Sequence, residues 1–558
     1  MAVTPKSVAS LMQKTLDRQA ALARMRLRFT KGQVKQILVG YIKDKNTGPY
    51  IELVKVLRAY ELNDDNFRIV FDESLSCVVL LGRELTDFVD VVCNIEWVNR
   101  SEEQIGLYSR FVLNLVTAHT YHCPLVLMRL LSLFKAEVEK WEDDPPPDVI
   151  NKWSNIHMII AQIVAIMPMT TDLLLHQVIE QFPYYKSGVF INRAYIHNLI
   201  WMSKYLPSLR EPLMSAIITR MIEMDVNIAG NDKNKAQDTI FEMELGDNDM
   251  VTDSLDYAML EMLKWLQEER DPILNILCNV FERLVLPTYG IGHVQFLLLY
   301  TISISQQCAD RTLTNLWTIA AGLQGLGPGA LTTRRIAANH LAGLLARCIR
   351  VPNSRLIKYL KSMAEWCHSY ITATQESTTA SDNVKAHGAF HAICHAVFYL
   401  VAFKHHLLFM NKENVNFVES LNLPRLVMCA LNPLRTCPPQ VTRAFASVTR
   451  SHQVVYCQTI IEKNARNSLI TTDVEHYDEW FPYDPYTLPR SGKILWPLCI
   501  EYKDWGKDGD ETQYTSMKRK LETDDDDFLM AASPTQRLAS SLSNCVSPGF
   551  KLSENILM

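Results

Sequence analysis

The sequence predicts an all-α protein, an α-solenoid of degenerate HEAT-like helical repeats. Apolar residues recur at helical spacing along most of the chain, and prolines interrupt this pattern at short intervals. Alternating strand patterns joined by Asn-Gly or Asp-Gly turns are missing, which disfavours a sheet-based fold. Because no strong linker divides the chain, helix pairs are expected to stack on their neighbours. No strict repeat can be aligned, so two or three helical bundles are the alternative.

Amphipathic helices are predicted, in chain order, by the i, i+3, i+4, i+7 spacing of apolar residues. The clearest examples lie within Leu53–Tyr60, Leu255–Leu266 and Leu356–Cys367. Prolines such as Pro168 and Pro272 are expected to end helices, which gives the helices ordinary lengths.

Two apolar stretches, Ile156–Met167 and Val294–Ile304, are predicted to be buried core helices. Each is too short to span a membrane. The N-terminus lacks the basic-then-apolar pattern of a signal peptide, so we expect a soluble, intracellular protein without membrane contact.

Residues 1–505 are predicted to form the solenoid, and two segments within it depart from the helical pattern. Residues 225–256 are acidic and poor in large aliphatic side chains, which predicts a mobile loop between helices. Residues 480–497, WFPYDPYTLPRSGKILWP, contain four prolines and cannot form one continuous helix. Residues 506–558 are acidic and then Ser-rich, which predicts a disordered tail.

The composition is that of a folded, reduced protein. Its 558 residues are 48% apolar and 21% charged, as is typical of globular domains. Thirteen cysteines are dispersed along the chain without a CxxC motif, which indicates free thiols rather than a disulfide framework.

Charge is distributed unevenly, although the formal net charge is only −5. Residues 311–461 contain fifteen Lys or Arg and five Asp or Glu, a difference of +10, and such a field attracts an oppositely charged partner. That partner is either DNA phosphate, contacted weakly, or an acidic protein surface; a merely solvated basic surface is the alternative. The candidate partner-binding residues are Arg334, Arg335, Arg347, Arg350, Arg355 and Lys358.

Motifs for catalysis are not recognisable, so no enzyme activity, catalytic residue, cofactor or small-molecule substrate is predicted. The glycine-rich stretch 322–335 has Pro328 where a phosphate-binding loop requires lysine. His387, His391 and His395 recur at i, i+4 and i+8 on one helix and span about 12 Å, too far for one zinc ion. We interpret them as packing or surface histidines, so no metal site is predicted; an enzyme with a cryptic metal site is the competing hypothesis.

The proline-rich segment 480–497 is interpreted as an ordered strap that closes the C-terminal end of the solenoid. Prolines fix an extended path, and its aromatic rings suit packing against helices. Stacking on nucleic-acid bases is the alternative. Arg490 and Lys493 are expected to remain available for a partner. The motif residues are Phe481, Pro482, Asp484, Pro485, Arg490, Ser491 and Lys493.

Two stretches, LNPLRTCPPQVTRAFASVTRSHQVVYCQTIIEKN (Leu431–Asn464) and FPYDPYTLPRSGK (Phe481–Lys493), resemble a known family. They are similar to the C-terminal core of the RNA polymerase I-specific transcription initiation factor, a HEAT-repeat family. Residues 182–227, 337–352 and 387–406 resemble it in the same order, so the similarity covers most of Ser101–Tyr502.

The resemblance implies an initiation factor without catalytic activity. It would bind RNA polymerase I subunits near the stalk and dock region and bridge the polymerase to the promoter-bound core factor, in the nucleus and nucleolus. Leu345–Pro352 (LARCIRVP) falls where the family has a basic helix associated with promoter-factor and DNA contact. Phosphorylation controls polymerase binding in the family, and the Ser-Pro residues Ser533 and Ser547 are the candidate phosphosites. A nuclear transport-type solenoid adaptor is the alternative function.

Overall fold

The computed structural model describes residues 29–135, 140–235, 243–288, 290–323, 330–376, 384–468, 482–483 and 486–502. These residues form helices and connecting turns. Cys348 and Cys499 among them form an isolated antiparallel bridge, which is too short to count as a β-sheet. The prediction of an all-α fold is confirmed. The chain divides into two units, Met1–Ile217 and Ile218–Met558.

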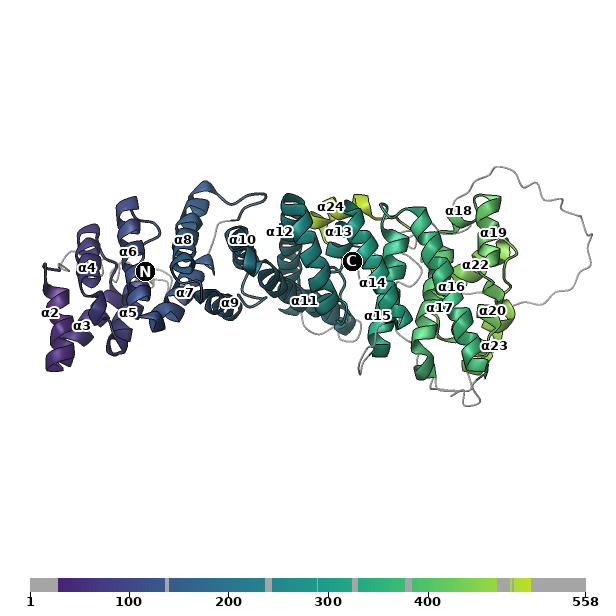
Figure 1. Ribbon diagram of the computed structural model, residues 1–558, viewed down its shortest axis with the longest axis horizontal. Helices are drawn as coiled ribbons and strands as arrows, with labels where there is room; N and C mark the ends of the chain where they lie inside the picture. The colour runs from purple at the N-terminus through teal and green to yellow at the C-terminus, as the bar shows by residue number, and fades with distance from the viewer. Residues whose placement is uncertain are drawn as a thin grey trace, which may run out of the picture. The chain divides into compact units, whose positions relative to one another are not determined.

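Unit 1 consists of helices in two rows (Figure 1). Its helices are α2 (Gln33–Asp44), α3 (Thr47–Ala59), α4 (Asp64–Ser76), α5 (Thr86–Cys93), α6 (Glu102–Ala118), α7 (Cys123–Ser132), α8 (Pro147–Ile166), α9 (Thr170–Glu180) and α10 (Val189–Tyr205). In one row α2 packs on α4, α4 on α6 and α6 on α8. In the other, α3 packs on α5, α5 on α7 and α7 on α9. This contact of each helix with the next but one is the packing of a helical solenoid.

Local signals in the sequence explain where several of these helices begin. Asn63 caps α4 by accepting a hydrogen bond from the backbone N–H of Asn66 at 2.9 Å. Ser101 and Gln104 form a capping box at the start of α6. Pro147 occupies the first turn of α8, where its missing N–H costs nothing.

Unit 2 is reached along α11 (Arg210–Lys235) and is organised around α17. Its helices are α12 (Met243–Val280), α13 (Phe296–Ile304), α14 (Gln306–Ala321), α15 (Ala330–Arg347), α16 (Asn353–Glu376), α17 (Gly388–Phe403), α18 (His405–Leu408), α19 (Lys412–Ser420), α20 (Leu423–Met428), α21 (Pro433–Thr436), α22 (Pro439–Ser451), α23 (Gln458–Ser468) and α24 (Pro489–Leu495). Every residue of α17 is buried, and the helix packs on α15, α16 and α22. It is therefore the core helix of this unit.

The expectation of a loop was wrong for the described part of residues 225–256, and so was the expectation that Pro272 ends a helix; residues 236–242 lie outside the described residues. Helix α11 continues to Lys235 and α12 begins at Met243, so most of the acidic segment is helical. Asp225 and Asp256 in this segment are buried, and their carboxylates accept hydrogen bonds from backbone N–H groups. These two acidic residues therefore stabilise the fold. Helix α12 also runs through Pro272, because Ile273 and Leu274 beside it are buried and packing outweighs the lost hydrogen bond.

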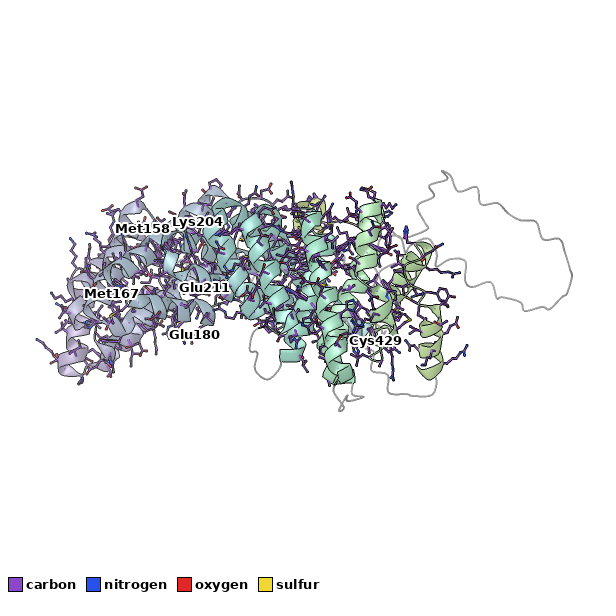
Figure 2. All side chains as sticks on the ribbon, turned by 45° about the vertical axis from the view of Figure 1, so that its right-hand side comes forward. Met158, Met167, Glu180, Lys204, Glu211 and Cys429 are labelled. Carbon is purple, nitrogen blue, oxygen red and sulfur yellow. The ribbon has the colours of Figure 1, made fainter. Side chains whose placement is uncertain are left out.

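The stretch predicted as a core helix, Ile156–Met167, forms the C-terminal half of α8. By length and composition α8 is the one described helix that could cross a membrane by itself. Its inner face, with Trp153, Ile156 and Ile160, is buried in unit 1. Its outer face includes Met158, which Figure 2 labels together with Met167 at the end of the helix.

The described cysteines are free, in agreement with their prediction as free thiols, and most of them are buried. Burial raises the pKa of the thiol of Cys93 to about 12 and that of Cys457 to about 11. These thiols are therefore protonated and poorly reactive at neutral pH.

Candidate functional site

The proline-rich segment, described at residues 482–483 and 486–502, lies across the helices at the start of unit 2. Helix α24 packs on α12, and Figure 1 shows it beside α12 and α13. The segment then ends in the bridge of Cys499 to Cys348, where Ile349 N–H donates to Leu498 O at 3.0 Å and Ile500 N–H to Arg347 O at 2.7 Å. From here on the name strap stands for residues 482–483 and 486–500, the described part of the predicted segment 480–497 with its continuation to the bridge.

Asp256 on α12 anchors the first turn of α24. Its buried carboxylate accepts hydrogen bonds from the backbone N–H groups of Arg490 and Ser491, each at 2.9 Å, and from the Ser491 hydroxyl. The Arg490 guanidinium approaches the same carboxylate at 3.5 Å and pairs with Asp253 at 2.7 Å. A carboxylate in this position satisfies N–H groups that a helix leaves unpaired at its start.

Two tyrosines fix the strap beneath α24. The ring of Tyr483 lies 5.3 Å from that of Phe296 on α13, and its hydroxyl lies 3.2 Å from His340 Nδ1 on α15. Tyr486 packs on Phe296 at 4.8 Å, and its hydroxyl lies 2.7 Å from the Ser491 hydroxyl. Burial raises the pKa of both phenols well above their usual value, so they are hydrogen-bonding core groups.

A buried aspartate and a histidine hold the strap at a third point. Asp225 accepts hydrogen bonds from the backbone N–H groups of His293 and Val294, at 2.7 and 2.9 Å. Its carboxylate also orients the His293 ring through Nδ1 at 2.9 Å. The opposite ring nitrogen lies 2.8 Å from the Thr487 hydroxyl, so the contact couples α11 to the strap through one imidazole.

Gly343 on α15 allows the strap to approach the helix. A Cβ at this position would lie 2.6 Å from the carbonyl oxygen of Pro482 and 2.7 Å from Tyr483 Cδ2.

We expect Gly343→Ala to lower the free energy of unfolding by about 1–3 kcal/mol, because the buried strap would have to shift. Chemical denaturation measures this change. Gly106→Ala on α6 is the control: no atom lies within 4 Å of its added Cβ, so it should be neutral or slightly stabilising. Equal effects of the two substitutions would contradict close packing at Gly343.

The position of the strap corrects part of its interpretation. It packs on α12, α13 and α15 and does not close the C-terminal helices of the unit, because its anchors Asp256, Phe296 and His340 lie early in the unit. Arg490, expected to be available for a partner, is bound to Asp253 and Asp256. Lys493 is exposed. Phe481, Asp484 and Pro485 lie outside the described residues, and Pro482 and Ser491 are buried.

The predicted basic residues do not form one exposed patch. Arg347 is only 5% exposed: its guanidinium donates to Ile500 O at 3.0 Å and lies 4.9 Å from the centroid of Phe403. Arg334 donates to Ala320 O at 3.0 Å and lies over the Trp366 ring. These two arginines therefore hold helices together.

Of the remaining basic residues, only some are exposed. Arg355 pairs with Asp310 at 2.6 Å, and Arg335 is half-buried. Arg350 and Lys358 are exposed, as is the neighbouring Lys361. Of the six predicted residues, only Arg350, just after α15, and Lys358, on α16, are thus exposed; Lys361, which was not among them, lies 3.8 Å from the Glu365 carboxylate.

The histidine stripe on α17 binds backbone, in agreement with its interpretation as packing. His391 Nε2 lies 3.1 Å from Leu431 O, and His395 Nε2 lies 2.9 Å from Pro433 O. Both carbonyls belong to the LNP motif that opens α21. His387 Nδ1 instead lies 2.9 Å from the Tyr370 hydroxyl. Within the described part of the chain no cluster of three His, Cys, Asp or Glu side chains is arranged to hold a metal ion.

Sequence reasoning missed the anchors Asp225, Asp256 and His293. Asp256 could have been noticed, because it stands three residues before Met259 and seven before Leu263, on the apolar face of its helix. An acid on such a face usually has a buried partner. Ser533 and Ser547 lie outside the described residues.

Comparisons with known proteins agree with this architecture. A family model described as "RNA polymerase I specific transcription initiation factor RRN3" matches residues 24–270 and 249–507. The chain is 28% identical to RNA polymerase I-specific transcription initiation factor RRN3 of Mus musculus, over 92% of this chain and 87% of that protein. It is 25% identical to the factor rrn3 of Schizosaccharomyces pombe, over 79% of this chain and 80% of that protein. The crystal structure of RNA polymerase I transcription initiation factor Rrn3 has a similar fold, with a TM-score of 0.69 and 20% identity over 84% of this chain and 97% of that chain.

Proposed function

Because the chain belongs to the family of RNA polymerase I specific transcription initiation factors RRN3, we propose that it recruits RNA polymerase I to the ribosomal DNA promoter by bridging to a promoter-bound core factor. The family consists of initiation factors, which are not enzymes. The match over residues 24–270 and 249–507 is the observation that carries this proposal. This match favours a role in transcription initiation over that of a nuclear transport-type adaptor. An adaptor role would not explain why the strap is present.

A bridging role is supported by the division of the chain into two units with different surfaces. On unit 1, residues 158–169 contain no Asp, Glu, Lys or Arg. Met158, Ile166 and Met169 there are 42%, 50% and 86% exposed. Exposed apolar side chains of this kind mark protein-binding surfaces. We assign this surface to a polymerase I subunit of the stalk or dock region.

On unit 2, the exposed cations Arg350, Lys358 and Lys361 suit an anionic partner. We assign them to the promoter side of the complex, where they would contact an acidic surface of the core factor or, weakly, DNA phosphate. The proposed site of action is the nucleolus. Phosphorylation of Ser533 and Ser547 by a proline-directed kinase would add about −2 charges at each and is the proposed regulation of polymerase binding.

We expect the double substitution Arg350→Glu with Lys358→Glu to weaken recruitment to immobilised promoter complexes about tenfold or more while polymerase binding persists. Both side chains are exposed, so reversing them should change the surface charge by −4 without disturbing the core. Pull-down on promoter DNA and on purified polymerase I measures the two activities.

The matched control is Lys55→Glu with Arg58→Glu, the same change of charge at exposed positions of α3 in unit 1. It should leave promoter recruitment intact. Equal loss of polymerase and promoter binding in the unit 2 variant, with unchanged folding, would refute the assignment of this surface.

A further inference from the structure

Basic side chains gather around the bridge between Cys348 and Cys499. Arg350 is exposed two residues after Cys348, and Lys404 follows the last residue of α17. The Lys404 ammonium lies 5.8 Å and the Arg347 guanidinium 4.9 Å from the centroid of the same ring, Phe403. The charges of Lys404 and Arg350 both act on the buried thiol of Cys348, so the three cations lie around the point where α15, α17 and the end of the strap meet.

Lys404 and Arg350 have no carboxylate partner among the described residues, in contrast to Arg355 with Asp310 and Arg490 with Asp253. Burial, with a smaller effect of the Arg347 charge, lowers the pKa of the Lys404 ammonium to about 8. Holding cations together in a partly buried place is unfavourable unless an anion joins them. The site is therefore suited to an acidic ligand.

An apolar side chain is exposed beside the bridge. Ile349, which is 54% exposed, stands between Cys348 and Arg350, and its N–H donates to Leu498 O at 3.0 Å. Trp496, which is 48% exposed, lies two residues before Leu498, and its indole N–H donates to Tyr486 O at 3.0 Å within the strap. A ligand that fits this surface carries both negative charge and large apolar side chains.

The chain's own C-terminal region starts at this site. The ring of Tyr502, the last described residue, lies 5.6 Å from that of Phe403. Nineteen residues, 503–521, separate Tyr502 from Glu522–Met530, ETDDDDFLM, an acidic run followed by three large apolar residues. Nineteen residues of random coil have an end-to-end distance of about 25 Å, which corresponds to an effective concentration in the millimolar range.

We propose that residues 522–530 dock intramolecularly on the surface formed by Arg350, Lys404 and Ile349. The aspartates Asp524–Asp527 meet the cations, and Phe528–Met530 cover Ile349. The docked segment shields this surface from other polyanions and so limits nonspecific binding of nucleic acid. The inference stands on the charge and geometry of the site and does not depend on which partner the proposed function assigns to unit 2.

The test compares full-length protein with the variant Asp524→Asn, Asp525→Asn, Asp526→Asn, Asp527→Asn, whose changes lie outside the described residues. Acylation of lysines with a soluble amine-reactive ester is followed by peptide mass spectrometry between pH 6.5 and 9. We expect Lys404 to react several-fold faster in the variant, because loss of the carboxylates lowers its pKa, and one pKa unit is tenfold in free amine. Lys152 in unit 1 should react equally in both proteins.

A second variant, Asp508→Asn with Asp510→Asn and Glu511→Gln, removes carboxylates of the same region outside the run and should leave Lys404 unchanged. Zero-length carbodiimide coupling should also join Lys404 to the peptide containing Asp524–Asp527, with a yield independent of protein concentration. The proposal is overturned by equal Lys404 reactivity in wild type and the Asp524–Asp527 variant, or by an equal effect of the second variant. Coupling that rises with protein concentration would identify a second copy as the occupant and would likewise overturn it.

Discussion

Replacing Asp256 by alanine is expected to release the strap and to lower the free energy of unfolding of unit 2 by about 3–5 kcal/mol. The fully buried carboxylate accepts hydrogen bonds from the backbone N–H groups of Arg490 and Ser491 and from the Ser491 hydroxyl. Hydrogen bonds to a charged group contribute about 1.5–3 kcal/mol each, and alanine would leave these donors buried and unpaired.

Hydrogen exchange of residues 486–500, together with chemical denaturation, measures this effect. Amides of α24 should exchange much faster in Asp256→Ala while those of unit 1 remain protected. The matched control is Asp253→Asn, which removes the other carboxylate on Arg490. The Asp253 side chain is 49% exposed, so this substitution should cost about 1 kcal/mol or less. Similar small losses in both variants would show that Asp256 does not anchor the strap.

Unit 2 is expected to lose stability steeply on mild acidification. Burial lowers the pKa of His340 and of His391 to about 3, against a usual value of 6.5. Between pH 6.5 and 3, the unfolded state binds protons that the folded state excludes. The free energy of unfolding is therefore highest above about pH 6.5 and decreases as the pH falls toward 3. Each histidine contributes about 1.36 kcal/mol per pH unit, or about 2.7 for the pair.

Denaturation of unit 2 at pH 7, 6 and 5 gives the slope of stability against pH. In His391→Gln, whose amide can still donate to Leu431 O, the slope should fall by about 1.4 kcal/mol per pH unit. His406→Gln, at an exposed position, is the control and should leave the slope as it is in the wild type. A slope that is the same in all three proteins would mean that His391 is not excluded from protonation by burial.

The helices were predictable because their signals are local. Runs such as Leu255–Leu266 repeat at the helical period, and the buried face of α12 follows them. The end of α12 was not predictable from Pro272, because the cost of a proline is local whereas the packing of Ile273 and Leu274 depends on other helices. The division into two units was not predictable either, because the boundary at Ile217 and Ile218 does not have the composition of a linker.

The direction of basic side chains could not be inferred from local sequence. Arg347 and Arg350 are three residues apart in one basic segment, yet one is buried and the other exposed. They differ because the Arg347 guanidinium donates to the carbonyl oxygen of Ile500, which lies 153 residues away in the chain. Similarly, Arg490 was expected to be available for a partner protein. The two carboxylates that bind it, Asp256 and Asp253, are 234 and 237 residues away in the chain, so local sequence gave no sign of them.

The proposal that the protein bridges polymerase and promoter is tested most directly by a three-component binding assay. Purified polymerase I is added to immobilised promoter DNA bearing core factor, with and without the full chain. We expect polymerase to be retained only when the chain is present. The exposed pair Ile166→Asp and Met169→Asp should abolish retention by loss of polymerase binding alone. Retention of polymerase without the chain, or binding of the chain to neither component, would show that the chain does not bridge the two.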